Sequence, residues 1–135
     1  RLLSFGQKRR LGVAAALALN PRTLILDEIT YGQDALEKER MMAYLQAINE
    51  KRGITIVLIS HDMDIVRRYA KRAVVLHHGR KVFDGAPREL FSGAYNVERW
   101  GLRHPTVASL AAALGVDAAT PEEFCAAVVR KGGEQ

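Results

Sequence analysis

The sequence predicts an α/β fold with a mainly parallel sheet, followed by a small helical extension. Two aliphatic runs, residues 24–26 and 54–59, have the composition of buried strands. The segment between them, 35–51, carries apolar residues at helical spacing, so strand, helix and strand succeed one another as in a right-handed crossover. Each aliphatic run ends in polar residues, and open α/β sheets bind ligands at that end of their strands. We therefore expect a functional site where these two strands end.

Size and composition restrict the class of protein. At 135 residues and 48% hydrophobic content, the chain suffices for one domain, or for one domain and a small appendage. Its single cysteine, Cys125, allows no internal disulfide and no cysteine-based zinc site, which fits a reducing compartment. The apolar runs are too short to span a membrane and the N-terminus does not resemble a secretory signal, so we expect a cytosolic location.

The formal net charge of +5 raises the question of a nucleic-acid partner. The basic excess lies before residue 102, where Lys and Arg are scattered over several predicted helices without interleaved aromatic residues. No nucleic-acid-binding motif accompanies them. We therefore expect no nucleic-acid partner, and interpret these residues as solvated helix faces.

The first predicted helix runs over 5–19. Ser4 is a good N-cap, and Gln7 three residues later completes a capping box. Gly6 permits close approach to the backbone, and the unpaired N–H groups of a helix start attract anions. A capped helix without a ligand explains the same residues. The expected buried stripe of this helix consists of Leu11, Ala14, Ala15, Leu17, Ala18 and Leu19.

The next strand, 23–28, is expected to be buried on both faces and ends in Asp27 and Glu28. Unpaired charge at the edge of a core is costly unless a cation or a reacting group requires it, although many strands simply end in a solvated acidic turn. Asp34 and Glu37 then begin a helix over 35–51, which Gly53 should end. Its expected inner face comprises Leu36, Met41, Met42, Leu45 and Ile48.

The second strand, 54–59, leads into Ser60-His61-Asp62, which places His61 at the same sheet edge as Asp27 and Glu28. A short helix over 63–71 should follow, with Ile65, Val66 and Tyr69 facing inward. We then expect a hairpin over 73–83 that turns at His78-Gly79, and a helix that starts at Pro87 and ends near Phe91.

We predict three segments: residues 1–91, a connector over 92–101, and a helical extension over 102–135. The extension should contain helices 106–114 and 121–130, the second capped by Thr120. Its apolar residues can pack either on the parent domain or on a partner.

Four short motifs together resemble the second half of the ATPase of ATP-binding cassette (ABC) transporters, a P-loop NTPase. They are Leu3-Ser4-Phe5-Gly6-Gln7 (signature motif), the strand that ends in Asp27-Glu28 (Walker B), Gly32-Gln33-Asp34 (D-loop) and Ser60-His61-Asp62 (H-loop). Each alone is weak, but their order and spacing are specific.

The resemblance implies a role for each site residue. Glu28 would polarise the attacking water, His61 would sense the γ-phosphate of ATP, and Asp27 would hold Mg²⁺ through water. The signature residues Ser4, Gly6 and Gln7 would contact the γ-phosphate of a nucleotide held by the opposite subunit. Asp34 would contribute from the D-loop.

The Gly-Gln-Asp form of the D-loop and the proline-led tail look most like the energy-coupling-factor ATPases, which drive vitamin and metal-ion uptake. Ile29 and Tyr31 depart from the proline and phenylalanine usual there. The resemblance implies ATP and Mg²⁺ as cofactors. It also implies a second ATPase subunit and transmembrane subunits as partners, with the protein peripheral on the cytoplasmic face of the cell membrane.

The sequence contains no G-x-x-x-x-G-K-[ST] phosphate loop. We therefore expect it to represent the C-terminal half of an ATPase, either shortened or encoded as a split gene, and to be inactive alone. The alternative is a non-catalytic interaction module, or a decayed half-ATPase without its own nucleotide site.

Overall fold

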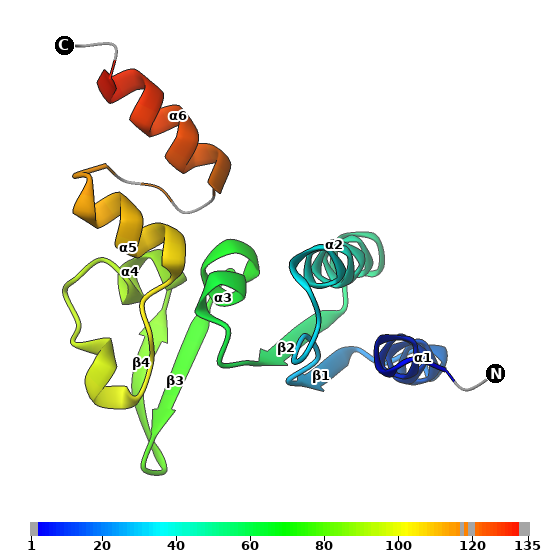
Figure 1. The fold of residues 1–135 in the computed structure, drawn as a ribbon. Helices are drawn as coiled ribbons and strands as arrows, with labels where there is room; N and C mark the ends of the chain where they lie inside the picture. Colours follow the sequence, from blue (N-terminus) through cyan, green and yellow to red (C-terminus); the bar gives the residue numbers. More distant parts are fainter. Residues whose placement is uncertain (1–2, 117, 119–120, 133–135) are drawn as a thin grey trace. The chain divides into compact units, whose positions relative to one another are not determined.

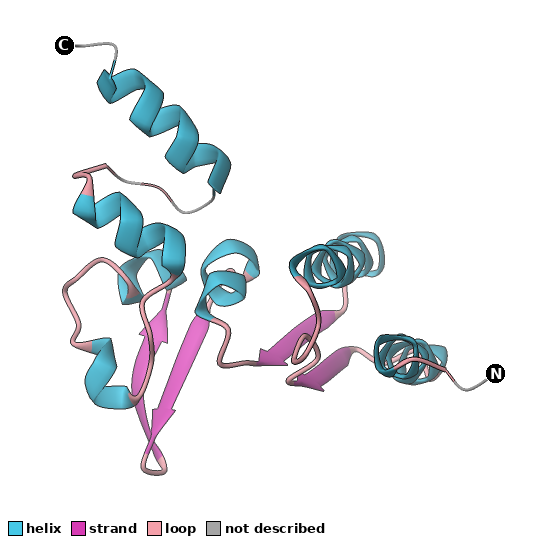
Figure 2. Ribbon diagram, viewed as in Figure 1, coloured by secondary structure: helices cyan, strands magenta, loops and turns pink. Residues whose placement is uncertain are grey.

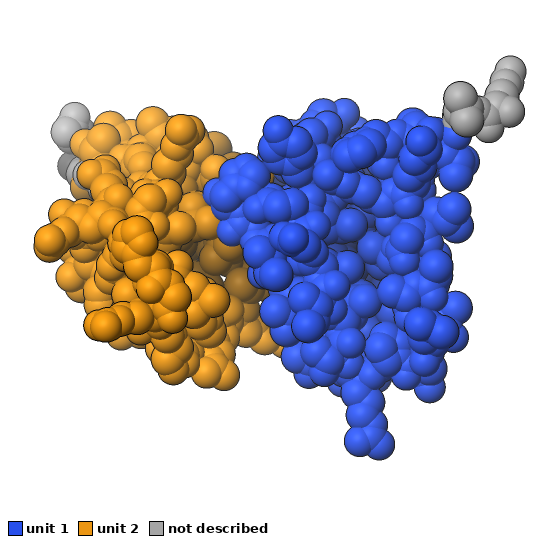
Figure 3. All heavy atoms as spheres, turned by 90° about the horizontal axis from the view of Figure 1, so that it is seen from below, with its two compact units in different colours: residues 1–61 blue, residues 62–135 orange. Residues whose placement is uncertain are grey.

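The computed structural model describes residues 3–116, 118 and 121–132. The chain divides into two compact units, residues 1–61 and 62–135, which Figure 3 shows in different colours. Helices and strands alternate through the first half of the chain, and helices make up its last part (Figure 2). The predicted division at residues 91 and 102 stays a prediction.

The first unit consists of helix α1 (Phe5–Ala18), strand β1 (Thr23–Asp27), helix α2 (Ala35–Arg52) and strand β2 (Thr55–Ile59) (Figure 1). The two strands pair in parallel, in a register that runs from Thr23 opposite Thr55 to Asp27 opposite Ile59. Since α2 connects two parallel neighbours, the predicted strand–helix–strand unit is confirmed.

One face of the small parallel sheet is buried and the other is exposed. Leu24 and Leu26 are buried, whereas Ile25 between them is 64% exposed. Val57 and Ile59 of β2 share this exposed face. The prediction that β1 is buried on both faces is therefore wrong. Side chains alternate along a strand, and only one of the two faces is covered in this structure.

The helices of the first unit bury fewer residues than expected. In α1 only Val13 and Leu17 are buried among the large apolar residues, and Leu11 and Leu19 are exposed, so the predicted wide stripe is wrong. Two positions four residues apart make a single narrow contact line. In α2 the predicted inner face is confirmed except for Leu36, which lies exposed in the first turn. The buried residues of that face are Met41, Met42, Leu45 and Ile48.

The predicted helix ends are confirmed where local chemistry determines them. Asp34 accepts a hydrogen bond from the Glu37 N–H at 2.8 Å and so caps α2. Gly53 ends the same helix with φ of 64°, a left-handed conformation that glycine adopts without strain.

The second unit begins with helix α3 (Met63–Tyr69) and a hairpin of strands β3 (Ala73–His77) and β4 (Arg80–Gly85). The hairpin turns at His78 and Gly79, as predicted, and both have positive φ (47° and 73°), as a type I′ turn requires. Helix α4 (Pro87–Leu90), the 3₁₀ helix η1 (Val97–Trp100), α5 (Thr106–Ala113) and α6 (Pro121–Gly132) follow.

The core of the second unit draws on its hairpin, on α3 and α4 and on η1. Its buried members are Met63, Ala73, Val75, Phe83, Leu90, Phe91 and Val97. The expected connector over 92–101 thus contains a helical turn whose Val97 is fully buried. The few apolar residues of this glycine-containing stretch give no periodic pattern, which is why the sequence predicted only loop there.

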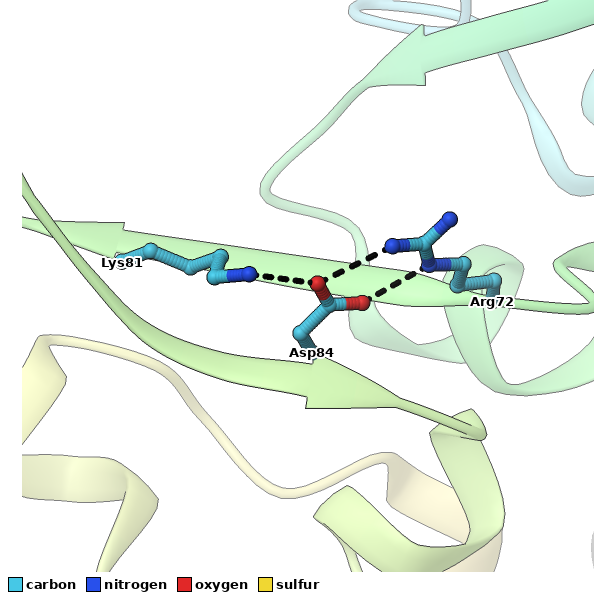
Figure 4. A network of polar contacts seen from close by, with 3 residues as sticks. All are labelled: Arg72, Lys81 and Asp84. Carbon is cyan, nitrogen blue, oxygen red and sulfur yellow. Dashed lines mark hydrogen bonds and ion pairs between the residues drawn. The ribbon is translucent and has the colours of Figure 1, made fainter.

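An ion network holds the edge of the hairpin (Figure 4). Asp84 on β4 accepts from the Arg72 guanidinium at 2.7 and 3.0 Å, and from the Lys81 ammonium at 2.7 Å. These hydrogen bonds, Arg72 first and then Lys81, hold the pKa of Asp84 well below the ordinary value. The network fixes β4 against the residue that precedes β3.

Helix α3 carries the polar contacts to the last two helices. Both carboxylate oxygens of Asp64 accept from Thr106, one from its N–H at 2.8 Å and one from its hydroxyl at 3.0 Å. Arg68 pairs with Glu122 of α6 at 3.6 Å. The predicted Thr120 cap lies outside the described residues. Within the described ranges, none of the helices is both long and apolar enough to cross a membrane.

Candidate active site

The start of α1 is closed by reciprocal hydrogen bonds. The Ser4 N–H donates to Gln7 Oε1 at 2.8 Å, and the Gln7 N–H donates to Ser4 Oγ at 3.2 Å, which confirms the predicted capping box. Accepting this bond leaves the Ser4 hydroxyl hydrogen able to donate to another group. The N–H groups of Phe5 and Gly6 belong to the first turn, where a helix offers donors to an anion.

Gly6 lies against a carboxylate. A Cβ atom at this glycine would stand 3.1 Å from Glu37 Oε2, and Arg10 lies 3.9 Å from the other oxygen of the same carboxylate. The close approach that Gly6 permits is therefore made here by the first turn of α2. The signature residues and the helix that follows the D-loop are thus neighbours.

The end of the parallel sheet brings Glu28 and His61 together. Glu28 Oε1 accepts from the His61 backbone N–H at 3.1 Å and lies 2.8 Å from His61 Nδ1. An ionised carboxylate can only accept, so the imidazole donates from Nδ1 and directs Nε2 elsewhere. The prediction that His61 and Glu28 share one sheet edge is confirmed.

The backbone at Glu28 adopts an uncommon conformation. Its φ is 47°, in the left-handed region, while its N–H still donates to Ile59 O at 2.9 Å as though the strand continued. Non-glycine residues rarely occupy this region, and where they do the surrounding structure holds them there. In this conformation the Glu28 carboxylate contacts both the backbone N–H and the ring of His61.

Asp27 is the last residue of β1 and is exposed. Its position next to Glu28 matches a carboxylate that holds Mg²⁺ through water, because Mg²⁺ retains most of its waters and uses few protein ligands. Within the described residues there is no group of three or more acidic, histidine or cysteine side chains that would hold a metal directly. The chemistry of Asp27 thus fits a water-mediated ion, and its role stays a prediction.

The D-loop is an ordered turn. The Tyr31 N–H donates to Glu28 O at 3.1 Å, the Gln33 N–H donates to Thr30 O at 3.3 Å, and Gly32 has φ of 71°. Thr30 is buried. Asp34 ends the loop, and its carboxylate is engaged as the cap of α2. The loop that follows Glu28 is therefore fixed by local hydrogen bonds.

Two residues near the site were missed by the sequence analysis. Arg9 Nη1 donates to Ile29 O at 3.2 Å and also to Tyr31 O, so a side chain of α1 holds the loop after β1. Tyr31 places its ring edge-on to the His61 imidazole, with centroids 5.9 Å apart. The sequence around Arg9 gives no indication that its guanidinium binds backbone carbonyls of the loop 20 residues later. The departure of Tyr31 from the usual residue was the only available clue.

Known proteins match most of the chain. No protein-family model matches it. It is 42% identical over 122 residues to "Energy-coupling factor transporter ATP-binding protein EcfA1" of Clostridium perfringens, covering 88% of this chain and 43% of that protein. It is 40% identical over 128 residues to a "Putative ABC transporter ATP-binding protein" of Lactiplantibacillus plantarum, covering 95% of this chain and 22% of that protein.

Solved structures give the same result. The structure of cbiO1 from Clostridium perfringens, described as part of the ABC transporter complex cbiONQ, matches with a TM-score of 0.64 and 38% identity, over 80% of this chain and 43% of that one. The dimeric ATP-binding cassette MJ0796, bound to ADP and Pi, matches with a TM-score of 0.58 and 34% identity, over 64% and 37%.

The chain spans less than half the length of these relatives. The two solved structures share 38% and 34% of their residues with the chain over the aligned parts. The α/β fold of an ABC ATPase is thereby confirmed for the part of the chain that aligns. The chain corresponds to part of the ATP-binding proteins of ABC transporters, and it is similar to the energy-coupling-factor ATPases among them.

Proposed function

We propose that the chain forms part of the ATP-hydrolysing subunit of an ABC-type importer of the energy-coupling-factor kind. The subunit would couple ATP hydrolysis to uptake of a small solute such as a vitamin or a metal ion. The observation that supports this most directly is the pairing of Glu28 Oε1 with His61 Nδ1, at 2.8 Å, where the two parallel strands end.

The paired side chains have the chemistry that the reaction needs. Glu28 is a carboxylate held from one side, so its remaining oxygen lone pairs can accept a proton from an attacking water and orient it. His61 donates to Glu28 from Nδ1, and Nε2 would donate to a terminal phosphate when the ring carries a proton on both nitrogens. Mg²⁺, held by Asp27 through water, would neutralise charge on the transferring phosphoryl group.

The start of α1 would act on a nucleotide bound by a second ATPase subunit. The Ser4 hydroxyl and the amides of the first turn are donors, and the positive end of the helix dipole favours an anion there. Gln7 completes the capping box and so fixes this turn. The partners in this proposal are therefore a second ATPase subunit and transmembrane subunits, at the cytoplasmic face of the membrane.

The catalytic role of Glu28 is tested in a chimera. The N-terminal part of EcfA1 from Clostridium perfringens, which precedes the matched region, is joined to residue 1 of this chain. In that protein Glu28→Gln should lower the rate of ATP hydrolysis by about 10² to 10⁴, because an amide cannot accept the proton of water. ATP binding should persist. Glu50→Gln, which changes an exposed acid of α2, is the matched control and should leave the rate unchanged.

If the Glu28→Gln chimera keeps more than about a tenth of the parent rate, the general base lies elsewhere. His61→Ala should also be nearly inactive, since it removes the group that holds Glu28 in place.

The chain alone should neither bind nor hydrolyse ATP appreciably. Its sequence contains no phosphate loop, so Asp27 and Glu28 have no held phosphate on which to act. Calorimetric titration with ATP and Mg²⁺ at low salt measures this. Binding in the micromolar range would contradict it.

A second candidate function is that of an interaction module without catalysis. Exposed apolar side chains on the last two helices, Leu110, Val128 and Val129, support it. The two functions differ in the chimera. An interaction module would leave the chimera without ATPase activity even when all four motifs are intact.

A further inference from the structure

The orientation of His61 depends on few contacts. Its side chain is 68% exposed, so core packing does not hold the ring. Glu28 contacts Nδ1 on one side, and the Tyr31 ring meets the imidazole edge-on, at 5.9 Å between centroids and 61° between planes. Aromatic pairs in this geometry attract each other beyond the area that they bury. The carboxylate fixes one atom of the ring, and the tyrosine restricts rotation about that atom.

Tyr31 is itself anchored, although its side chain is not buried. The residue is 61% exposed, yet its N–H donates to Glu28 O at 3.1 Å and its carbonyl accepts from Arg9. The same nitrogen of Arg9 donates to Ile29 O, so the guanidinium joins two carbonyls of the loop. The loop is thereby closed from Glu28 to Tyr31.

Arg9 is held in turn at the start of α1. Its guanidinium lies over the Phe5 ring, 4.3 Å from the centroid, which is a cation–π contact. Phe5 is the middle residue of the signature motif. A continuous set of contacts therefore leads from that motif through Arg9 and Tyr31 to His61.

We propose that Tyr31 is a positioning residue for His61 and that Arg9 positions Tyr31. Tyr31 keeps the imidazole in the rotamer and tautomer that present Nδ1–H to Glu28, and Arg9 holds the loop that carries Tyr31. The significance of this pair for catalysis rests on the proposed function. The contact itself does not, since it is made within residues 5–61 of this chain.

Nuclear magnetic resonance of the 135-residue chain, labelled with ¹⁵N-histidine, tests the proposal. In mildly alkaline buffer, where imidazole is neutral, the nitrogen shifts of His61 report the ratio of the Nδ1–H to the Nε2–H tautomer. His61→Asn assigns the signals. Tyr31→Leu should lower the ratio by about threefold, the size expected of one aromatic contact. Tyr31→Phe should keep it, because the ring edge remains.

Matched controls separate positioning from a general loss of structure. Tyr44→Leu removes an exposed tyrosine of α2 in the same unit and should leave the ratio as in the parent. Arg9→Gln should lower the ratio as Tyr31→Leu does. Arg10→Gln, which removes the neighbouring cation that faces Glu37, should not.

Two results would overturn the proposal. One is an unchanged tautomer ratio in Tyr31→Leu, or equal ratios in Tyr31→Leu and Tyr31→Phe. The other is the absence of nuclear Overhauser contacts between the Tyr31 and His61 ring protons in the parent chain, where we expect them to be present. This measurement needs no variant, so it tests the contact even if Tyr31→Leu fails to fold.

The chimera separates this proposal from the proposed function. There Tyr31→Leu should lower kcat about threefold with an unchanged KM for ATP, and Tyr31→Phe should restore kcat. If Glu28→Gln remains active while the tautomer ratio responds as expected, the proposed function fails and the positioning of His61 stands. If Glu28→Gln is inactive and the tautomer ratio does not respond to Tyr31→Leu, the positioning proposal fails and the proposed function stands.

Discussion

The contact between Asp64 and Thr106 gives a quantitative test of how the last helices are attached. Asp64→Ala removes two acceptors at once, one for the Thr106 N–H and one for its hydroxyl. The N–H belongs to the first residue of α5 and has no carbonyl partner within that helix. Removing such a cap costs about 0.5–2 kcal/mol, and an exposed site lies toward the middle of that range.

We therefore expect Asp64→Ala to lower the free energy of unfolding of the second unit by about 1.5 kcal/mol. Thr106→Val removes only the hydroxyl donor and keeps the β-branched shape, so it should cost about 0.7 kcal/mol. Thr106→Ser keeps the donor and is the matched control. In the double variant the hydroxyl bond is already lost, so the two costs should not add.

Urea unfolding followed by tryptophan fluorescence is the assay. Trp100 is the only tryptophan and packs against the core cluster of the second unit, so its emission reports on that unit. The unfolding midpoint and slope give the free energy by linear extrapolation. A cost below about 0.3 kcal/mol for Asp64→Ala, or full additivity with Thr106→Val, would refute the reasoning.

Three further predictions concern charge, surface and association. Arg72 depresses the pKa of Asp84, so their contact stabilises the fold above the ordinary carboxyl pKa of about 4 and is lost as pH falls further. Asp84→Asn should therefore lower the free energy of unfolding measured with urea at neutral pH. It should also make that free energy fall less steeply as the pH is lowered. Ile25→Thr with Val57→Thr should reduce binding of an apolar fluorescent dye with little effect on stability, because both residues lie on the exposed sheet face. The intact chain should self-associate more than a chain that ends at Gly101, since α5 and α6 expose apolar side chains; equal sedimentation of the two would contradict this.

Most helices and strands, and the sheet edge at which the site lies, could be predicted from the sequence. Capping chemistry is local, so Ser4 with Gln7 and Asp34 predicted two helix starts correctly. The parallel pairing followed from the order of strand, helix and strand. That order also places the residues after both strands at one edge, which is why the sequence predicted Glu28 and His61 at the same edge, and the structure adds their direct contact.

Burial and long-range contacts could not be predicted, because they depend on how distant parts of the chain pack together. Ile25 reads as a core residue, but which face of a strand is covered depends on elements elsewhere in the chain, and here that face is exposed. Val97 is buried through packing of a turn that has no periodicity. Arg9 reaches carbonyls 20 and 22 residues away, and backbone acceptors carry no residue type that a sequence could display. The left-handed φ of Glu28 arises in the same way, since the β2 backbone and His61 hold this residue by contacts that only the folded chain brings together.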